Sequence, residues 1–296
     1  MITNKKFLNK FFIYTGVLIL TFQSFEKPVY SFIPNVYEPN KKELESTSLT
    51  IGKTAAQLIY FGQTKKANQL ALLAVKINPN NDKIWAILAE TEVRINQLDK
   101  AIESLNKAKK INPLFANYWF KQAGILIQQG KTSNAIKSIN KGLEIDPDNP
   151  NAYFQLGNSR FLQKEFNIAL IAFQKASSIN PKFWQALNNQ GLILYELKKT
   201  EEAIMKWKSV LKIERDAEPL LALAVALYST NENKEKSFIY AKEALEINPN
   251  YVLSKYQEEQ LWGDLLRKET EKFFTSPELT GTVQKALANA TLNNEL

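Results

Sequence analysis

The sequence contains no cysteine and no histidine among its 296 residues. Disulfides and thiol nucleophiles need cysteine, structural zinc sites need cysteine or histidine ligands, and Ser-His-Asp triads need imidazole as general base. All of these are therefore excluded. Only carboxylates, lysine and tyrosine remain as possible catalytic groups, and the sequence has no glycine-rich phosphate-binding loop.

Three pairs of acidic residues are the remaining candidates for acid–base chemistry: Glu201–Glu202, Glu258–Glu259 and Asp146–Asp148. We expect them at a helix start, on a solvated cap face and in a turn, where acidic side chains have structural roles. General acid–base catalysis would also need a concave pocket that raises one pKa. The sequence therefore predicts no enzyme, no metal and no cofactor, and a carboxylate-based hydrolase is the alternative.

The positive charge is modest once its location is considered. The chain carries 38 Lys and Arg against 30 Asp and Glu, a net charge of +8. Residues 1–31 hold four lysines against one glutamate, so the remainder is only mildly basic. Because phosphate neutralisation dominates the affinity for nucleic acids, a mildly basic chain without a strongly basic face predicts no nucleic-acid partner.

The N-terminus has the pattern of an export signal. Lys5, Lys6 and Lys10 precede an uncharged apolar stretch over residues 11–25. As a helix, this stretch would reach about 22 Å, short of the roughly 30 Å hydrocarbon core. We therefore expect residues 1–31 to be a signal peptide cleaved before Phe32, with a retained membrane anchor as the alternative. The expected location is the periplasm, the thylakoid lumen or a membrane surface.

After residues 32–47, which contain Pro34 and Pro39 and are predicted to be a linker or strap, the chain repeats every 34 residues. Similar pentapeptides begin at Ile77, Ile111, Ile145 and Ile179, and another begins at Ile247, two repeats later. Prolines stand at their third positions, where they would stop a helix: Pro79, Pro113, Pro147, Pro181 and Pro249. The missing proline falls on Arg215.

This pattern resembles the tetratricopeptide repeat, a helix–turn–helix unit of 34 residues. The best-matching unit has Tyr153, Leu156, Gly157, Ala169, Phe173, Ala176 and Pro181 at the family positions. Two units depart from it, with Gln122 and Gln190 in place of leucine. The resemblance implies an all-α, right-handed solenoid of about six repeats over residues 48–251. Residues 252–296 are predicted to form capping helices and a frayed tail.

In this family the first helices of the repeats line a groove, so the resemblance implies a scaffold that binds protein or peptide clients there. Amide side chains can pair with a client backbone, and aromatic side chains can take its apolar residues. The residues expected in the groove are Asn117, Phe120, Lys121, Asn151, Phe154, Gln155, Asn158, Phe161, Gln185, Asn188, Asn189 and Tyr195. The alternative is that these are solvated surface positions of an asparagine-rich chain. Ala86, Ile87 and Glu90 offer no cationic clamp for a client carboxylate.

A narrower resemblance extends over nearly the whole chain. Four segments are similar to a cyanobacterial and plastid group of exported or plastid-targeted tetratricopeptide proteins, to which the plant Slow Green protein is also similar: residues 32–40, 181–199, 218–229 and 261–270. It implies a factor that assembles photosynthetic complexes at the thylakoid membrane. The alternative is a membrane-tethered adaptor or chaperone-like factor unrelated to photosynthesis.

Overall fold

The computed structural model describes residues 37–290, in which all regular structure is helical and no strand occurs. The predicted signal or anchor, residues 1–31, lies outside this range. Residues 45–290 belong to one compact unit, which contains every described helix except the first turn of α2. None of the helices between residues 37 and 290 combines the length and apolarity that crossing a membrane requires.

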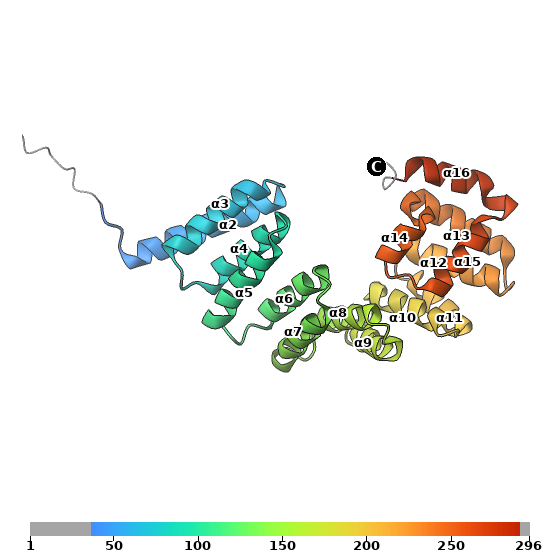
Figure 1. Cartoon of the computed structure of the whole chain (residues 1–296), viewed down its shortest axis with the longest axis horizontal. Helices are drawn as coiled ribbons and strands as arrows, with labels where there is room; N and C mark the ends of the chain where they lie inside the picture. Colours follow the sequence, from blue (N-terminus) through green and yellow to red (C-terminus); the bar gives the residue numbers. More distant parts are fainter. Residues whose placement is uncertain (1–36, 291–296) are drawn as a thin grey trace, which may run out of the picture. The chain divides into compact units, whose positions relative to one another are not determined.

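Six helix pairs follow one another in chain order within the described residues (Figure 1). From α4 onward each first helix packs against its own second helix, and from α3 onward each second helix packs against the first helix of the next pair. Helices α2 and α3 share a buried cluster through Ala55 and Ala71. This is the arrangement of an α-solenoid, which confirms the predicted fold class. The pairs are α2 (Lys41–Tyr60) with α3 (Thr64–Ile77), α4 (Asp82–Arg94) with α5 (Leu98–Ile111), α6 (Ala116–Gln128) with α7 (Thr132–Ile145), α8 (Pro150–Leu162) with α9 (Phe166–Ile179), α10 (Trp184–Glu196) with α11 (Thr200–Val210), and α12 (Ala217–Ser229) with α13 (Lys234–Ile247).

The turn inside each of the first five pairs has one residue with positive φ. These residues are 34 positions apart: Gly62, Asn96, Gly130, Lys164 and Lys198. Glycine adopts this conformation without strain, whereas a lysine there costs some free energy. The glycines indicate two of these turns in the sequence, but at the lysine positions only the 34-residue phase marks the turn.

Helices within a pair approach closely where one of them has glycine. A Cβ atom added at Gly157 would lie 2.6–2.7 Å from three ring atoms of Phe173. The ring of Trp207 fills the same role against Gly191, and Phe120 lies against Gly142. Gly124 differs, because a Cβ there would meet no atom within 4 Å. The family positions with small residues are therefore packing requirements in this chain.

Replacing Gly157 with alanine is expected to lower the free energy of unfolding by about 1–3 kcal/mol, because the new methyl group would push the fully buried Phe173 ring out of place. Replacing Gly124 with alanine is expected to raise it by about 0.5–1 kcal/mol, since alanine favours a helix and space is free. Urea denaturation midpoints measure both changes. Equal midpoints for the two variants would contradict the close packing at Gly157.

The two glutamines that replace the family leucine are buried and bonded to neighbouring helices. The Oε1 atom of Gln122 accepts from Lys109 Nζ at 2.5 Å and from Ser138 Oγ at 3.3 Å. The Nε2 atom of Gln190 donates to Ser177 Oγ at 2.9 Å. These departures from the repeat pattern therefore join helices of successive pairs through polar contacts in the interior.

The first helix begins earlier than predicted, so the linker prediction is wrong for residues 41–47. Asn40 Oδ1 accepts from the Glu43 backbone N–H at 3.1 Å, and Glu43 Oε2 accepts from the Asn40 N–H at 2.9 Å. This reciprocal pair is a capping box, which satisfies two backbone donors at a helix start. It starts α2 directly after Pro39, ahead of the repeat pattern.

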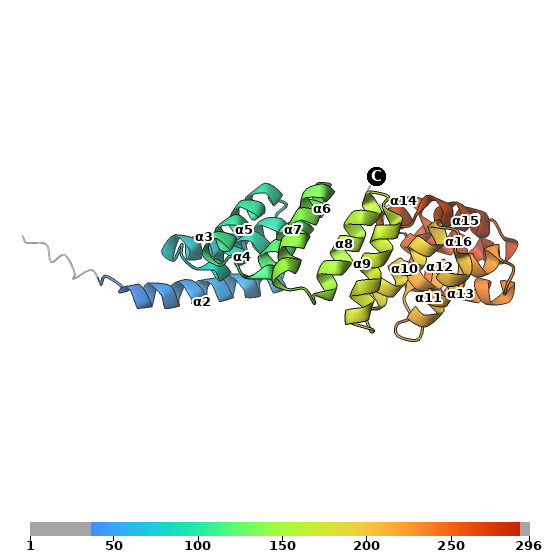
Figure 2. The ribbon, with the colours of Figure 1, turned by 90° about the horizontal axis from the view of Figure 1, so that it is seen from below.

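The chain after the sixth pair folds back onto the solenoid (Figure 2). It comprises η1 (Pro249–Val252), α14 (Ser254–Glu259), α15 (Asp264–Phe274), η2 (Pro277–Leu279) and α16 (Thr280–Asn289). Helix α16 packs against α13 and η1, whereas α15 packs against α12 and α10. We call residues 249–290 the C-terminal cap. The C-terminal cap contacts the first helix of the last pair, α12, and also the first helix of the preceding pair, α10.

Candidate client-binding face

The first helices α4, α6, α8, α10 and α12 supply one face of the solenoid, which we call the first-helix face. Helix α15 covers this face at α10 and α12. We call that region the covered part, and the region of α4, α6 and α8 the open part. The helices of the C-terminal cap make at most minor contacts with α4, α6 and α8, so the open part is the larger surface that a client of the predicted kind can contact directly.

Three large side chains hold the cap on the covered part. Trp262, Leu266 and Phe273 are almost entirely buried. The Trp262 Nε1–H donates to Glu218 Oε1 at 3.0 Å, and the ring centroid of Phe273 lies 4.6 Å from that of Tyr228. The cap therefore shares the solenoid core.

Glu196, at the end of α10, fixes the start of α15. Its carboxylate oxygens accept from the backbone N–H groups of Leu265 at 3.1 Å and Leu266 at 2.9 Å. The first N–H groups of a helix have no partners within the helix, and a carboxylate near them also favours the helix dipole. A residue of the solenoid thus supplies the cap helix with its N-terminal partner.

Four residues predicted for the groove are buried in the structure. Asn188 and Tyr195, on α10, are 0% and 3% exposed, and the Tyr195 hydroxyl donates to Ser229 Oγ at 3.2 Å. Asn189 is 9% exposed, and Phe120 belongs to the core around Gly142. These side chains contact other parts of the chain, which the sequence pattern did not indicate.

The other eight predicted groove residues have exposed surface. Asn117, Lys121 and Asn151 are exposed. The half-buried ones are Phe154, Gln155, Asn158, Phe161 and Gln185. Asn158 Oδ1 accepts from Asn189 Nδ2 at 3.1 Å, and the Phe154 ring packs 5.0 Å from the Phe183 ring. The binding role of these residues stays a prediction.

The open part contains a hollow of about 190 Å³ between α4 and α6. It is lined by Ala89, Glu90, Val93, Leu105, Lys121, Gly124, Ile125 and Gln128. Lys121 is the one residue among these that was predicted to bind a client, and Glu90 is the other that the sequence placed at a groove position. A glycine at a groove position, Gly124, is the signal that could have indicated the hollow.

A second hollow, of about 280 Å³, lies where α8 and α9 meet the cap. Phe161 and Phe166 form part of its wall, and Trp262 and Arg267 come from the cap. Arg267 pairs with Asp264 at 2.6 Å and with Glu258 at 3.5 Å. The sequence did not indicate this hollow, because its walls come from segments about 100 residues apart.

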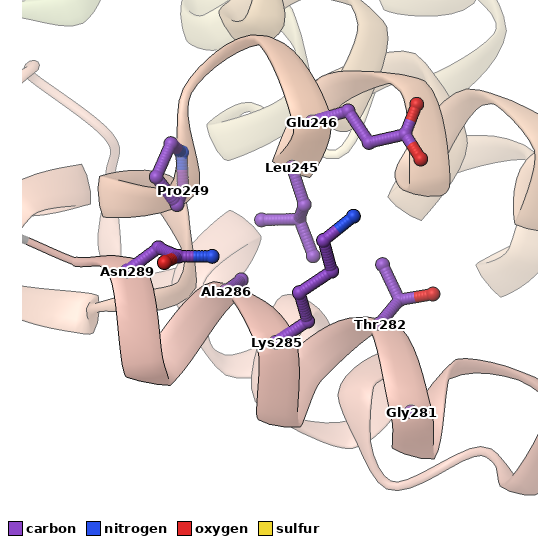
Figure 3. A pocket seen from close by; sticks show the side chains of 8 residues that line it. All are labelled: Leu245, Glu246, Pro249, Gly281, Thr282, Lys285, Ala286 and Asn289. Carbon is purple, nitrogen blue, oxygen red and sulfur yellow. The ribbon is translucent and has the colours of Figure 1, made fainter.

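The hollow drawn in Figure 3, of about 480 Å³, is formed by α13, η1 and α16. It is lined by Leu245, Glu246, Pro249, Gly281, Thr282, Lys285, Ala286 and Asn289. None of these residues belongs to a first helix, so this hollow is separate from the candidate face. Over residues 37–290, no three acidic side chains cluster as metal ligands would.

Comparison with protein-family models identifies the repeats. Models of the tetratricopeptide repeat match residues 82–113, 152–219 and 217–251, and a TPR repeat model matches residues 124–164. Together these matches span more than half of the sequence. The chain belongs to the tetratricopeptide repeat family.

Solved structures share the fold at low sequence identity. PilF of Pseudomonas aeruginosa is 18% identical with a TM-score of 0.62, and the match covers 74% of this chain and 98% of PilF. PilW, a widely conserved type IV pilus biogenesis factor, is 18% identical with a TM-score of 0.59 over 75% of this chain and 97% of PilW. YrrB, a TPR protein with an unusual peptide-binding site, is 19% identical with a TM-score of 0.50 over 64% of this chain and 97% of YrrB. No curated protein matches this chain. At these identities the likeness concerns the fold.

Proposed function

We propose that this chain is a non-catalytic scaffold that binds an extended segment of a client protein along the open part of the first-helix face. The observation that carries the proposal is the contrast between the two parts of this face. The chain's own cap occupies the covered part, whereas the open part combines exposed amides with an apolar hollow. Amides can pair with a client backbone without reading its sequence, and a hollow can take an apolar side chain.

Photo-crosslinking in the native cell tests this proposal. A photoreactive amino acid is placed at Asn117 or Asn151, which are exposed at equivalent positions of α6 and α8. The control carries it at Gln174, which is exposed on the second helix α9. We expect the same client proteins to be captured from both first-helix positions and not from Gln174. Capture of the same proteins at all three positions, or of none at Asn117 and Asn151, would contradict the proposal.

We further propose that the scaffold acts at a membrane and assists the assembly of photosynthetic complexes. The support for the site of action is the N-terminal pattern of lysines followed by an apolar stretch over residues 11–25. The support for the assembly role is the narrower sequence resemblance. The same crosslinking experiment tests the site of action and the assembly role. The client proteins identified by mass spectrometry test the assembly role, and the N-terminal peptide of the captured scaffold shows whether residues 1–31 are retained. Clients unrelated to photosynthetic membranes would count against the assembly role.

A further inference from the structure

The hollow between α4 and α6 has an apolar floor inside a polar rim. Ala89, Leu105 and Ile125 form the floor and are at most 5% exposed, and Val93 lies beside them. A floor of this kind contributes no hydrogen-bonding groups. Filling it with an apolar side chain would remove apolar surface from water, which is favourable in proportion to the area removed.

The absence of a side chain at Gly124 keeps this hollow open. The equivalent residues of the next two first helices, 34 and 68 positions later, are Asn158 and Leu192. At Gly124 an added Cβ would meet no atom within 4 Å, so the neighbouring residues have not closed over the glycine. The space that a side chain occupies elsewhere on this face is available here to a side chain of another molecule.

The rim beside the hollow carries an excess positive charge. Glu90 pairs with Lys121 Nζ at 3.1 Å and with Arg94 Nε at 3.5 Å. Two cations therefore share one carboxylate, and both cationic side chains retain exposed surface. A negative charge close to this group would be favoured, although solvent screening keeps such an exposed contribution small.

We propose that this hollow is a specificity pocket for a leucine-sized apolar side chain of the client, with a carboxylate next to it in the client sequence. This inference rests on the proposed function and specifies which client segments the open part accepts. The apolar side chain takes the space above Gly124, and the carboxylate faces Lys121 and Arg94. The amides farther along the face then contact the client backbone.

Methyl NMR of the full chain, titrated with synthetic hexapeptides, tests the pocket. The three peptides are Ser-Gly-Leu-Glu-Gly-Ser, Ser-Gly-Asn-Glu-Gly-Ser and Ser-Gly-Leu-Lys-Gly-Ser, each acetylated and amidated. We expect the Leu-Glu peptide to shift the methyl signals of Ala89, Val93, Leu105 and Ile125. The Asn-Glu peptide should bind about tenfold more weakly or worse, because it leaves the floor unfilled. The Leu-Lys peptide should bind about two- to fivefold more weakly than the Leu-Glu peptide.

Matched variants assign the signal to the pocket. Gly124→Leu fills the hollow with its own side chain and should reduce binding of the Leu-Glu peptide at least tenfold. Gly281→Leu adds the same side chain to α16, outside this hollow, where a Cβ is also unobstructed, so this variant should bind like the unmodified chain. Thermal melting confirms that each variant folds, and if Gly124→Leu does not, the three-peptide comparison alone decides.

The pocket is disproved if the Leu-Glu peptide shifts none of the four floor signals, or if the Asn-Glu or Leu-Lys peptide shifts them equally well. Undiminished binding in folded Gly124→Leu would also disprove it. These outcomes differ from failure of the proposed function. Crosslinking from Asn117 and Asn151 with no response to the leucine peptides would overturn the pocket alone. A pocket that responds as expected, combined with no captured client, would overturn the scaffold proposal.

Discussion

Replacing Phe273 with alanine is expected to lower the free energy of unfolding by about 3–5 kcal/mol, the usual cost of removing a large buried aromatic side chain. Phe273 is fully buried. Its ring centroid lies 4.6 Å from that of Tyr228 on α12 and 5.7 Å from that of Phe238 on α13. The substitution therefore leaves a cavity where the cap meets the last helix pair. Chemical denaturation followed by circular dichroism measures the loss.

Lys272→Ala is the matched control, because Lys272 is the preceding residue of α15 and its side chain is 59% exposed. Its ion pair with Glu269 lies at the surface, so the control should change stability by less than about 1 kcal/mol. Hydrogen exchange then locates the effect. In Phe273→Ala the amides of α15 and α12 should exchange faster, while those of α4 should not change. Stability equal to that of the control would show that the cap is not part of the solenoid core.

The division of the first-helix face into an open and a covered part limits which repeats can bind a client. A solenoid commonly offers one extended surface along all its repeats. Here the last two first helices are occupied by Trp262, Leu266 and Phe273 of the same chain. Of the five first helices that define this face, a client therefore has access to α4, α6 and α8, and specificity depends on their side chains.

The helix pairs were predictable from sequence because the repeat imposes the same local choices every 34 residues. Prolines such as Pro147 end second helices, and small residues such as Gly157 permit the close approach to Phe173. At Arg215 the repeat lacks its proline, but the 34-residue spacing still predicts that the next helix, α12, begins shortly after this position. The start of α2 was missed, because the Asn40–Glu43 capping box is independent of the repeat.

The candidate face was less predictable, because periodicity identifies equivalent positions but not what covers them. Asn188 is a groove position in the repeat pattern, yet α15 of the cap packs on its helix, and Asn188 is fully buried. One signal was present in the sequence of α12, whose residues 219–227 are apolar on every side and all buried. A helix that is apolar all round must be covered all round. This pattern predicts a further element over α12, although it does not identify which one.

Glu218 is expected to make the stability of the cap depend on pH. It lies in the first turn of α12 and accepts from Trp262 Nε1 of the cap at 3.0 Å. Burial raises the pKa of Glu218 to about 7, and the charge of Asp216 acts in the same direction. Hydrogen bonds with Trp262 and Asn188 act in the opposite direction but do not cancel the effect of burial. Burial raises the pKa of the Tyr251 hydroxyl, in η1, and the negative charge of Glu218 acts in the same direction.

The sign of the pH dependence follows from the proton bound to Glu218. In the unfolded chain the carboxyl group ionises near 4.5, whereas in the folded chain it stays protonated up to about 7. Between these values the folded state binds more protons, so the free energy of unfolding falls as the pH rises. The expected slope is on the order of 1 kcal/mol per pH unit, or about 3 kcal/mol over the window. Above pH 7 this contribution is lost.

Glu218→Gln isolates this effect, because glutamine keeps an oxygen acceptor for Trp262 but cannot ionise. Urea denaturation at pH 5, 6, 7 and 8 compares it with the unmodified chain and with Glu271→Gln, which alters an exposed carboxylate of α15. We expect Glu218→Gln to lose most of the downward slope between pH 5 and 7 and to be more stable than the unmodified chain at pH 8. Glu271→Gln should keep the slope. If both variants follow the unmodified chain at every pH, Glu218 is ionised in the folded state, and the cap must then accommodate its charge beside Trp262.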